Sequence, residues 1–122
     1  MTQIQVKRVY SDPDGSPSDD GMRIYVDRLW PRGESKDKFH YDMWAKDIAP
    51  STALREWYHQ SPVERWEEFG KRYVLELRSN PAVDALIAKL RCESLVTLLY
   101  SSKDEEHNNA VVLAGYLRTC LA

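Results

Sequence analysis

The feature that most constrains this chain is the segment 22–33, which begins with a strand-like pattern and ends as an arginine-rich loop. Met22, Ile24 and Val26 recur with a period of two, the spacing by which a β-strand buries one face. Pro31 then has no N–H for a sheet hydrogen bond, and the glycine two positions later favours a turn. The segment therefore predicts a strand that ends shortly before the proline, with the arginines at its carboxyl end.

Two other segments predict strands. Residues 4–10 begin with apolar and polar side chains in alternation, and residues 95–100 are almost entirely apolar and β-prone, as in a central strand covered on both faces. Between the first two strands, residues 11–21 are rich in Asp, Pro, Gly and Ser and predict an exposed loop. This loop is too short for a helical crossover, so the two strands are either antiparallel neighbours or are joined by a loop that crosses the sheet.

Four helices are expected in the rest of the chain. The clearest begins with Ser61 as N-cap, Pro62 in the first turn and Glu64 completing a capping box, followed by about four turns of helical apolar spacing. Residues 34–42 lack a period and predict a loop, and residues 44–48 predict a helical turn. The other helices are expected after Ser51 or Thr52, after Asn80, and from about Glu105 to Leu121.

This order of elements predicts a single α/β layered domain over residues 1–122, with a short sheet, mostly parallel or mixed, flanked by helices. A long helical crossover separates the second strand from the last, so we expect these two strands to be parallel. Their carboxyl ends would then share one edge of the sheet, where open α/β sheets place their ligands. That edge would bring together Arg28, Trp30, Arg32, Ser101, Ser102, Lys103, Asp104 and His107.

Composition excludes several classes of protein. The formal net charge of −2 gives no general attraction to nucleic acid or to an anionic membrane, so an anion site would have to be local. We expect no secretory signal in residues 1–10 and no membrane span, because no apolar run reaches about 18 residues. Cys92 and Cys120 lack metal-site spacing and are expected to be packing residues in a cytoplasmic protein.

The predicted edge has the chemistry of an anion-binding pocket. Arg28 and Arg32 offer planar, permanently charged donors for phosphate or carboxylate, and Trp30 could wall the pocket or stack on a planar ligand. The remaining candidate ligand-binding residues are Ser101, Lys103, Asp104 and Asn108.

A purely structural interpretation competes with this hypothesis. Asp104, Glu105 and Glu106 would stabilise the dipole of the last helix without any ligand, and Asp27 and Asp47 could pair with the arginines. The arginines would then lock loops onto the sheet, and the sequence leaves both interpretations open.

Evidence for catalysis is limited to one histidine. His107 follows the last strand and, with Asp27 or Asp104, is the best candidate for proton transfer. No Gly-x-Ser-x-Gly, Walker A or GxGxxG motif is present, and His40 and His59 lack metal-ligand spacing. We therefore expect no metal and no cofactor.

Four strings resemble those of the YeaO-like proteins, a bacterial family built on domain of unknown function 488: KRVY at 7–10, VDRLWPRG at 26–33, DIAPS at 47–51 and LLYS at 98–101. The resemblance implies an α/β fold with no assigned substrate. Many members of the wider family carry a cysteine at the end of the last strand and a Cys-His-Arg triplet that opens the following helix. Here Tyr100 stands at the first position, and Glu106, His107 and Asn108 stand at the triplet. The resemblance thus implies that binding could persist but that covalent cysteine chemistry could not.

The leading hypothesis is a protein that binds a small phosphorylated or carboxylated molecule, a nucleotide among the options. The competing hypothesis is a non-enzymatic, self-associating interaction or regulatory module, based on the aromatic residues Tyr41, Trp44, Trp57 and Tyr58, because such residues favour interfaces. Nucleic-acid binding is disfavoured by the acidic balance.

Overall fold

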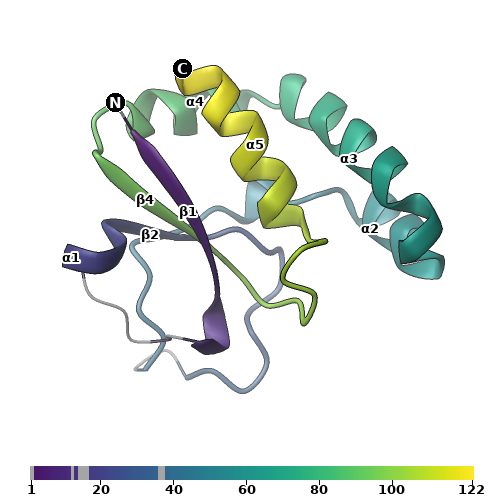
Figure 1. Ribbon diagram of the computed structural model, residues 1–122, viewed down its shortest axis with the longest axis horizontal. Helices are drawn as coiled ribbons and strands as arrows, with labels where there is room; N and C mark the ends of the chain where they lie inside the picture. The colour runs from purple at the N-terminus through teal and green to yellow at the C-terminus, as the bar shows by residue number, and fades with distance from the viewer. Residues whose placement is uncertain (1, 12, 14–16, 36–37) are drawn as a thin grey trace.

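A four-stranded parallel sheet forms the centre of the computed structural model, which describes residues 2–11, 13, 17–35 and 38–122 (Figure 1). The strands lie in the order β1-β4-β2-β3. Their bounds are Gln3–Arg8 (β1), Met22–Tyr25 (β2), Met43–Trp44 (β3) and Leu95–Tyr100 (β4). The helices are α1 (Pro17–Asp20), α2 (Thr52–Gln60), α3 (Pro62–Arg78), α4 (Pro81–Leu90) and α5 (Asn109–Leu121), with 3-10 turns η1 (Val9–Ser11) and η2 (Lys46–Ile48).

The predicted α/β class and the parallel pairing of the second and last strands are confirmed. β4 lies between β1 and β2, with Ile4 beside Val96 and Ile24 beside Leu98. The alternative of antiparallel first strands is therefore wrong. The position of β4 follows from its sequence, because an almost continuous apolar strand is best buried at the centre of the sheet.

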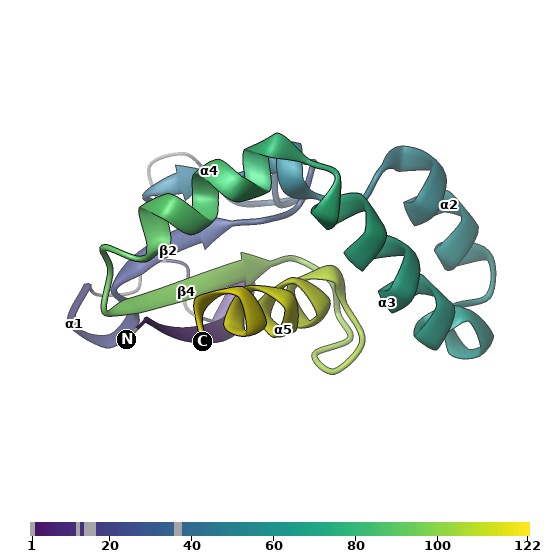
Figure 2. The same ribbon diagram turned by 90° about the horizontal axis from the view of Figure 1, so that it is seen from above.

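The two faces of the sheet are covered differently. Helices α4 and α5 lie over one face, and the α2–α3 pair extends beyond the end of the sheet (Figure 2). Alternate strand residues such as Ile24 and Leu98 are buried under these helices. Tyr25 and Leu99 point to the opposite face and pack with Val9 and Phe39, which come from the segments that follow β1 and β2. Because successive strand residues point to opposite faces, the sheet has a separate hydrophobic core on each face.

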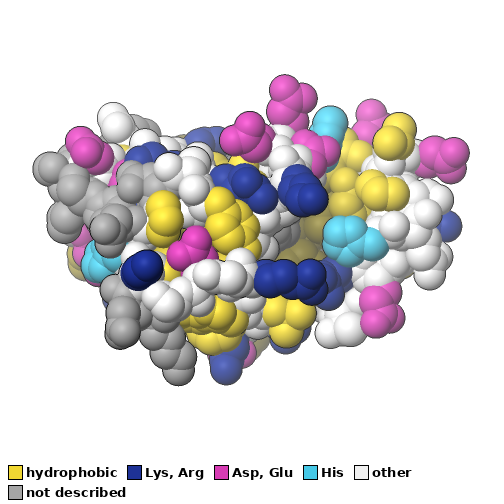
Figure 3. Space-filling view, turned by 90° about the horizontal axis from the view of Figure 1, so that it is seen from below, with side chains coloured by type: hydrophobic (Ala, Val, Ile, Leu, Met, Phe, Trp, Pro, Cys, Tyr) yellow, Lys and Arg dark blue, Asp and Glu magenta, His cyan; other side chains and the backbone are white. Residues whose placement is uncertain are grey.

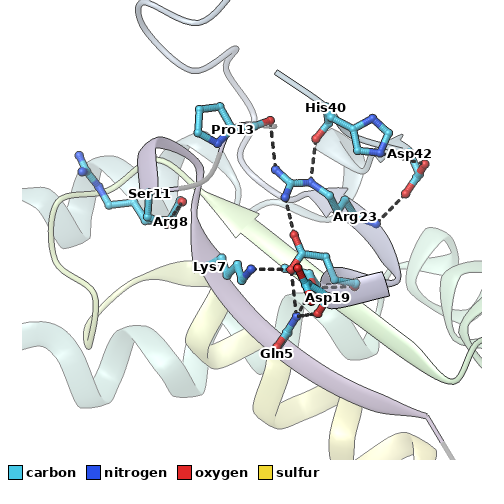
Figure 4. Close-up of polar contacts among 11 residues, drawn as sticks. Gln5, Lys7, Arg8, Ser11, Pro13, Asp19, Arg23, His40 and Asp42 are labelled. Carbon is cyan, nitrogen blue, oxygen red and sulfur yellow. Dashed lines mark hydrogen bonds and ion pairs between the residues drawn. The ribbon is translucent and has the colours of Figure 1, made fainter. Parts of the chain in front are cut away.

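A buried ion network fixes the start of β2. The Arg23 and Asp20 side chains are both fully buried and form an ion pair, and Lys7 pairs with the same carboxylate. Figure 4 shows Arg23 also donating to the backbone oxygens of Pro13 and His40. The network therefore ties β2 to the segment before it and to the segment after it. These two segments cross the second face of the sheet.

Several predicted boundaries differ from the structure. Helix α5 begins at Asn109, not near Glu105, because the Asn108 side chain accepts a hydrogen bond from the Val111 N–H and caps the helix there. The acidic residues 104–106 therefore precede the helix and do not form its first turn.

Two short elements and one cap were also predicted incorrectly. Ser61 precedes α3 but its side chain makes no capping hydrogen bond, so the predicted capping box is absent. Helix α1 lies within the predicted loop 11–21. The predicted turn at 44–48 is confirmed as η2, except that its first residue, Trp44, belongs to β3. The two predicted loops include residues 12, 14–16 and 36–37, which lie outside the described part of the chain.

Candidate functional site

A cavity of about 570 Å³ opens where the carboxyl ends of β1, β2 and β4 face helix α2. Figure 3 shows a hollow bordered by Lys and Arg side chains on two sides, with apolar and His side chains at one end. The described lining residues are Arg8, Tyr10, Asp27, Arg28, Leu29, Trp30, Arg32, Ala49, Pro50, Arg55, Tyr58, His59, Phe69, Ser101, Ser102, Lys103, His107, Asn108 and Asn109. Its volume is in the range of small-molecule sites.

Two loops distant in sequence meet at this cavity through Asp27. One carboxylate oxygen of Asp27 accepts hydrogen bonds from the Ser101 backbone N–H at 2.9 Å and from the Ser101 hydroxyl at 2.6 Å. The Asp27 backbone oxygen accepts a third bond from the Trp44 indole at 2.7 Å. The predicted convergence of the segments after β2 and β4 is thus present, and Asp27 joins them.

Five cationic side chains line the cavity: Arg8, Arg28, Arg32, Arg55 and Lys103. Among the lining residues that the structure describes, Asp27 is the only carboxylate, and none of the five cations forms an ion pair with a described residue. The predicted pairing of Asp27 and Asp47 with the arginines is therefore absent from the described contacts.

Two of the arginines are held by neutral backbone groups. Arg8 donates from Nε to the backbone oxygen of Ser102 at 2.8 Å, and Arg28 donates from Nη2 to that of Pro50 at 3.3 Å. A carbonyl oxygen orients a guanidinium but does not neutralise its charge, and each arginine has further N–H groups. These contacts therefore position the arginines and leave their charge uncompensated.

Trp30 forms a wall of the cavity that is itself packed. Its ring lies 5.5 Å from the ring of Phe39 and 5.6 Å from that of Trp44, measured between centroids, and its indole N–H donates to the backbone oxygen of Glu34 at 2.7 Å. Edge-on packing of this kind fixes an aromatic ring in one orientation. Trp30 is therefore a rigid part of the second core that also borders the cavity.

Only some of the candidate residues in the loop before α5 line the cavity. His107 and Asn108 line the cavity, whereas Asp104 is absent from the described lining. His107 Nδ1 lies 3.2 Å from a carboxylate oxygen of Asp104, and the His107 ring packs edge-on against Trp66. The Asn108 amide is committed to Val111 and to the Asp104 backbone oxygen.

The charge state of Asp104 follows from this loop. Backbone N–H groups of His107 and Glu106 donate to its carboxylate, and they hold its pKa below the usual value of 3.8. The carboxylate therefore stays charged beside His107 at neutral pH. Proton transfer by His107 with Asp104 stays a prediction, while Asp27 is already engaged by Ser101.

Sequence reasoning missed one group of lining residues. Arg8 is the last residue of β1 and Tyr10 lies just after it, and the same strand-end rule that found Arg28 would have found them if β1 had been assigned as parallel. Arg55 and His59 come from α2, and nothing in the local sequence signals that this helix faces the sheet edge. Burial, followed by the charge of Arg55, lowers the pKa of His59 below 6.5, so His59 is mainly neutral at pH 7.

The aromatic residues behind the interaction hypothesis are packed within the chain. Trp57 is half-buried, with the Arg65 and Arg72 guanidinium carbons 4.7 and 4.1 Å from its ring centre. Tyr58 is buried in the main core. Tyr41 and Trp44 pack with Trp30 on the second face of the sheet. These contacts give each ring a partner within the chain, and self-association stays a prediction.

Neither a spanning helix nor a metal cluster is found in the described part of the chain. No helix there has the length and apolar character needed to cross a membrane. No three His, Cys, Asp or Glu side chains of the described residues are grouped so that they could hold a metal ion.

Comparison with known proteins decides the family. The model of the family described as "Inactive DUF488-N3 subclade" matches residues 3–122. The chain belongs to the DUF488 family. It is 45% identical over 116 residues to "Uncharacterized protein Rv3073c" of Mycobacterium tuberculosis, covering 95% of this chain and 94% of the relative. It is 42% identical to "Uncharacterized protein YeaO" of Escherichia coli, covering 95% and 97% of the two chains, and the YeaO-like resemblance is thus confirmed. No solved structure matches.

The description of this subclade as inactive agrees with three residues of the chain. Tyr100 is buried at the end of β4, and Glu106 and Asn108 flank His107 in the following loop. These are the positions at which the family resemblance places two cysteines and an arginine. A site without those thiols retains the cavity and its cations but lacks a cysteine nucleophile.

Proposed function

We propose that this protein binds a small anion, bearing phosphate or carboxylate groups, in the cavity at the carboxyl edge of its sheet. Arg28 and Arg32 clamp the anion, Lys103 adds a mobile positive charge, and Trp30 supplies a rigid wall. Ser101 presents a hydroxyl whose position is fixed by Asp27. Recognition in this proposal requires no cysteine chemistry.

The observation that carries the proposal is the uncompensated positive charge of the cavity. Five cations line it, against one carboxylate that is already bonded to Ser101. Like charges gathered around a hollow repel one another, and the protein as a whole has a net charge of −2. Arginines that served only to lock loops would be paired with carboxylates, as Arg23 is with Asp20. An anionic ligand would supply the missing counter-charge.

The arrangement is also consistent with tight geometric recognition. Arg8 and Arg28 are oriented by backbone oxygens before any ligand arrives, which reduces the entropy lost on binding. Guanidinium donors match the oxygen spacing of phosphate and carboxylate, and hydrogen bonds to charged groups contribute about 1.5–3 kcal/mol each. Loss of one such contact corresponds to roughly a 10- to 100-fold weaker affinity.

A thermal-shift screen tests the proposal, with inorganic phosphate, pyrophosphate, citrate and nucleotides as probes. A ligand at ten times its Kd stabilises the folded state by about 1.4 kcal/mol, which raises the Tm of a domain of this size by about 5 °C. Arg28→Ala and Arg32→Ala should each remove most of that shift while their unliganded Tm stays near that of the parent protein. Arg78→Ala is the matched control, because Arg78 is exposed at the end of α3 and does not line the cavity.

Two outcomes would contradict the proposal. A flat response across the panel would leave the cavity without a ligand and favour the interaction hypothesis, which light scattering of dilute protein tests directly. Loss of folding in both arginine variants, with normal folding of Arg78→Ala, would instead assign the arginines to a structural network.

A further inference from the structure

We infer that the ligand of this cavity carries a flat apolar ring in addition to its anionic group, and that Leu29 contacts this ring. The inference rests on the proposed function and narrows it to ring-bearing phosphorylated molecules. Leu29 lies between Arg28 and Trp30 and lines the cavity, yet its side chain is 62% exposed. A large apolar side chain so exposed beside charged groups has no packing role in the fold.

The backbone of Leu29 is held in place while its side chain is left uncovered. The buried Tyr25 ring donates from its hydroxyl to the Leu29 backbone oxygen at 2.6 Å. Burial, followed by the charge of Asp27, raises the pKa of this hydroxyl, so it remains a donor. The loop is therefore fixed at this residue, so the Leu29 side chain is exposed although its backbone is held in place.

Apolar side chains also line the cavity. Ala49, Pro50, Tyr58 and Phe69 line it, and all four are buried. The Tyr58 and Phe69 rings lie 4.4 Å apart between centroids, which gives a preformed aromatic surface. These residues come from the segment before α2, from α2 and from α3. Of the cations, Arg8 ends β1, Arg28, Arg32 and Lys103 lie in the loops after β2 and β4, and Arg55 shares α2 with Tyr58.

A cavity lined by both cationic and apolar side chains indicates a ligand with two unlike parts. Inorganic phosphate would satisfy the guanidiniums but would leave the exposed Leu29 side chain in water. A ring attached to the phosphate would cover Leu29, and burial of apolar area is favourable in proportion to the area removed from water. The volume of about 570 Å³ accommodates both parts.

The test compares 1-naphthyl phosphate with inorganic phosphate by calorimetric titration at one ionic strength. The parent protein should bind 1-naphthyl phosphate at least about tenfold more tightly than phosphate. Leu29→Ala should weaken the binding of 1-naphthyl phosphate about fivefold and leave the affinity for phosphate unchanged. Leu75→Ala is the matched control, because Leu75 is 60% exposed on α3 and does not line the cavity.

The outcomes separate this inference from the proposed function. If both probes bind equally tightly and Arg28→Ala weakens both, the anion site stands and the ring-binding inference is wrong. Equal losses for the two probes in Leu29→Ala would also overturn it. If neither probe binds, both proposals fall. The comparison of the two probes on the parent protein remains decisive even if Leu29→Ala does not fold.

Discussion

The ion pair between Asp20 and Arg23 offers the sharpest test of how this fold is held together. Both side chains are fully buried, and Lys7 shares the Asp20 carboxylate. Asp20→Asn keeps the size of the side chain but removes its charge, and so takes one carboxylate away from the buried Arg23 guanidinium and from Lys7. Breaking a buried pair in this way costs about 3–5 kcal/mol, a large fraction of the 5–15 kcal/mol that stabilises a typical domain.

A second ion pair in the same chain provides the matched control. Arg72 and Glu68 lie one helical turn apart with 3.0 Å between Nε and the carboxylate oxygen, and their side chains are 48% and 51% exposed. Exposed pairs of this spacing contribute only about 0.3–0.5 kcal/mol. Glu68→Gln should therefore shift the urea midpoint slightly, whereas Asp20→Asn should shift it strongly without changing the slope. A cost below about 1 kcal/mol for Asp20→Asn would refute the reasoning.

The pH dependence of the same variant gives an independent check. Burial alone would raise the pKa of Asp20, but hydrogen bonds and charges from Lys7 and Arg23 outweigh it and hold the pKa below 3.8. The unfolded chain therefore binds a proton more readily, so stability rises with pH through this range. The contribution of Asp20 is complete above about pH 5 and is lost as the pH falls through its folded-state pKa. The unfolding free energy of the parent protein should fall more steeply than that of Asp20→Asn between pH 5 and pH 2.

Three further substitutions test particular contacts. Gly21 has φ of +61°, and a Cβ there would lie 2.1 Å from the Leu95 backbone oxygen, so Gly21→Ala should cost more than about 2 kcal/mol in urea unfolding. Gly33→Ala, at φ of +84° with open space around it, should cost only about 1 kcal/mol, and equal costs would contradict the steric argument. Tyr73→Phe removes a buried hydroxyl that donates to the Ile48 backbone oxygen at 2.6 Å. It should cost about 1–3 kcal/mol by the same assay, and no measurable change would show that this bond does not stabilise the fold.

Much of the fold could be predicted because its signals are local. The period of two in β2 and the helical spacing in α3 are properties of short windows. The structure has α3 where it was expected, and β2 begins as expected but ends at Tyr25 and not shortly before Pro31. The predicted start of α5 was wrong because two residues near it are candidate helix caps. Asp104 accepts hydrogen bonds from the N–H groups of Glu106 and His107, while Asn108 caps the helix itself. Sequence alone does not rank one Asx cap above another four residues away.

The candidate site was predicted only where it follows from strand ends. Arg28, Arg32 and Lys103 lie in the loops after β2 and β4, so the parallel pairing of those strands was enough to bring them together. Arg55 could not be found in this way. Arg55 is on α2. The position of α2 over the sheet edge depends on the packing of α2 against α3 and of α3 against α5.

By itself, the sequence determined the kinds of elements, the class of fold and the arginine-rich edge, because hydrophobic period and proline chemistry act over a few residues. Only the tertiary structure decided the strand order, the commitment of Asp27 to Ser101 and the lack of ion pairs to the lining arginines among the described contacts. These properties depend on which distant side chains meet, and a guanidinium is paired or unpaired only after the whole chain has folded. The same holds for Leu29, whose exposure depends on what the rest of the fold leaves uncovered.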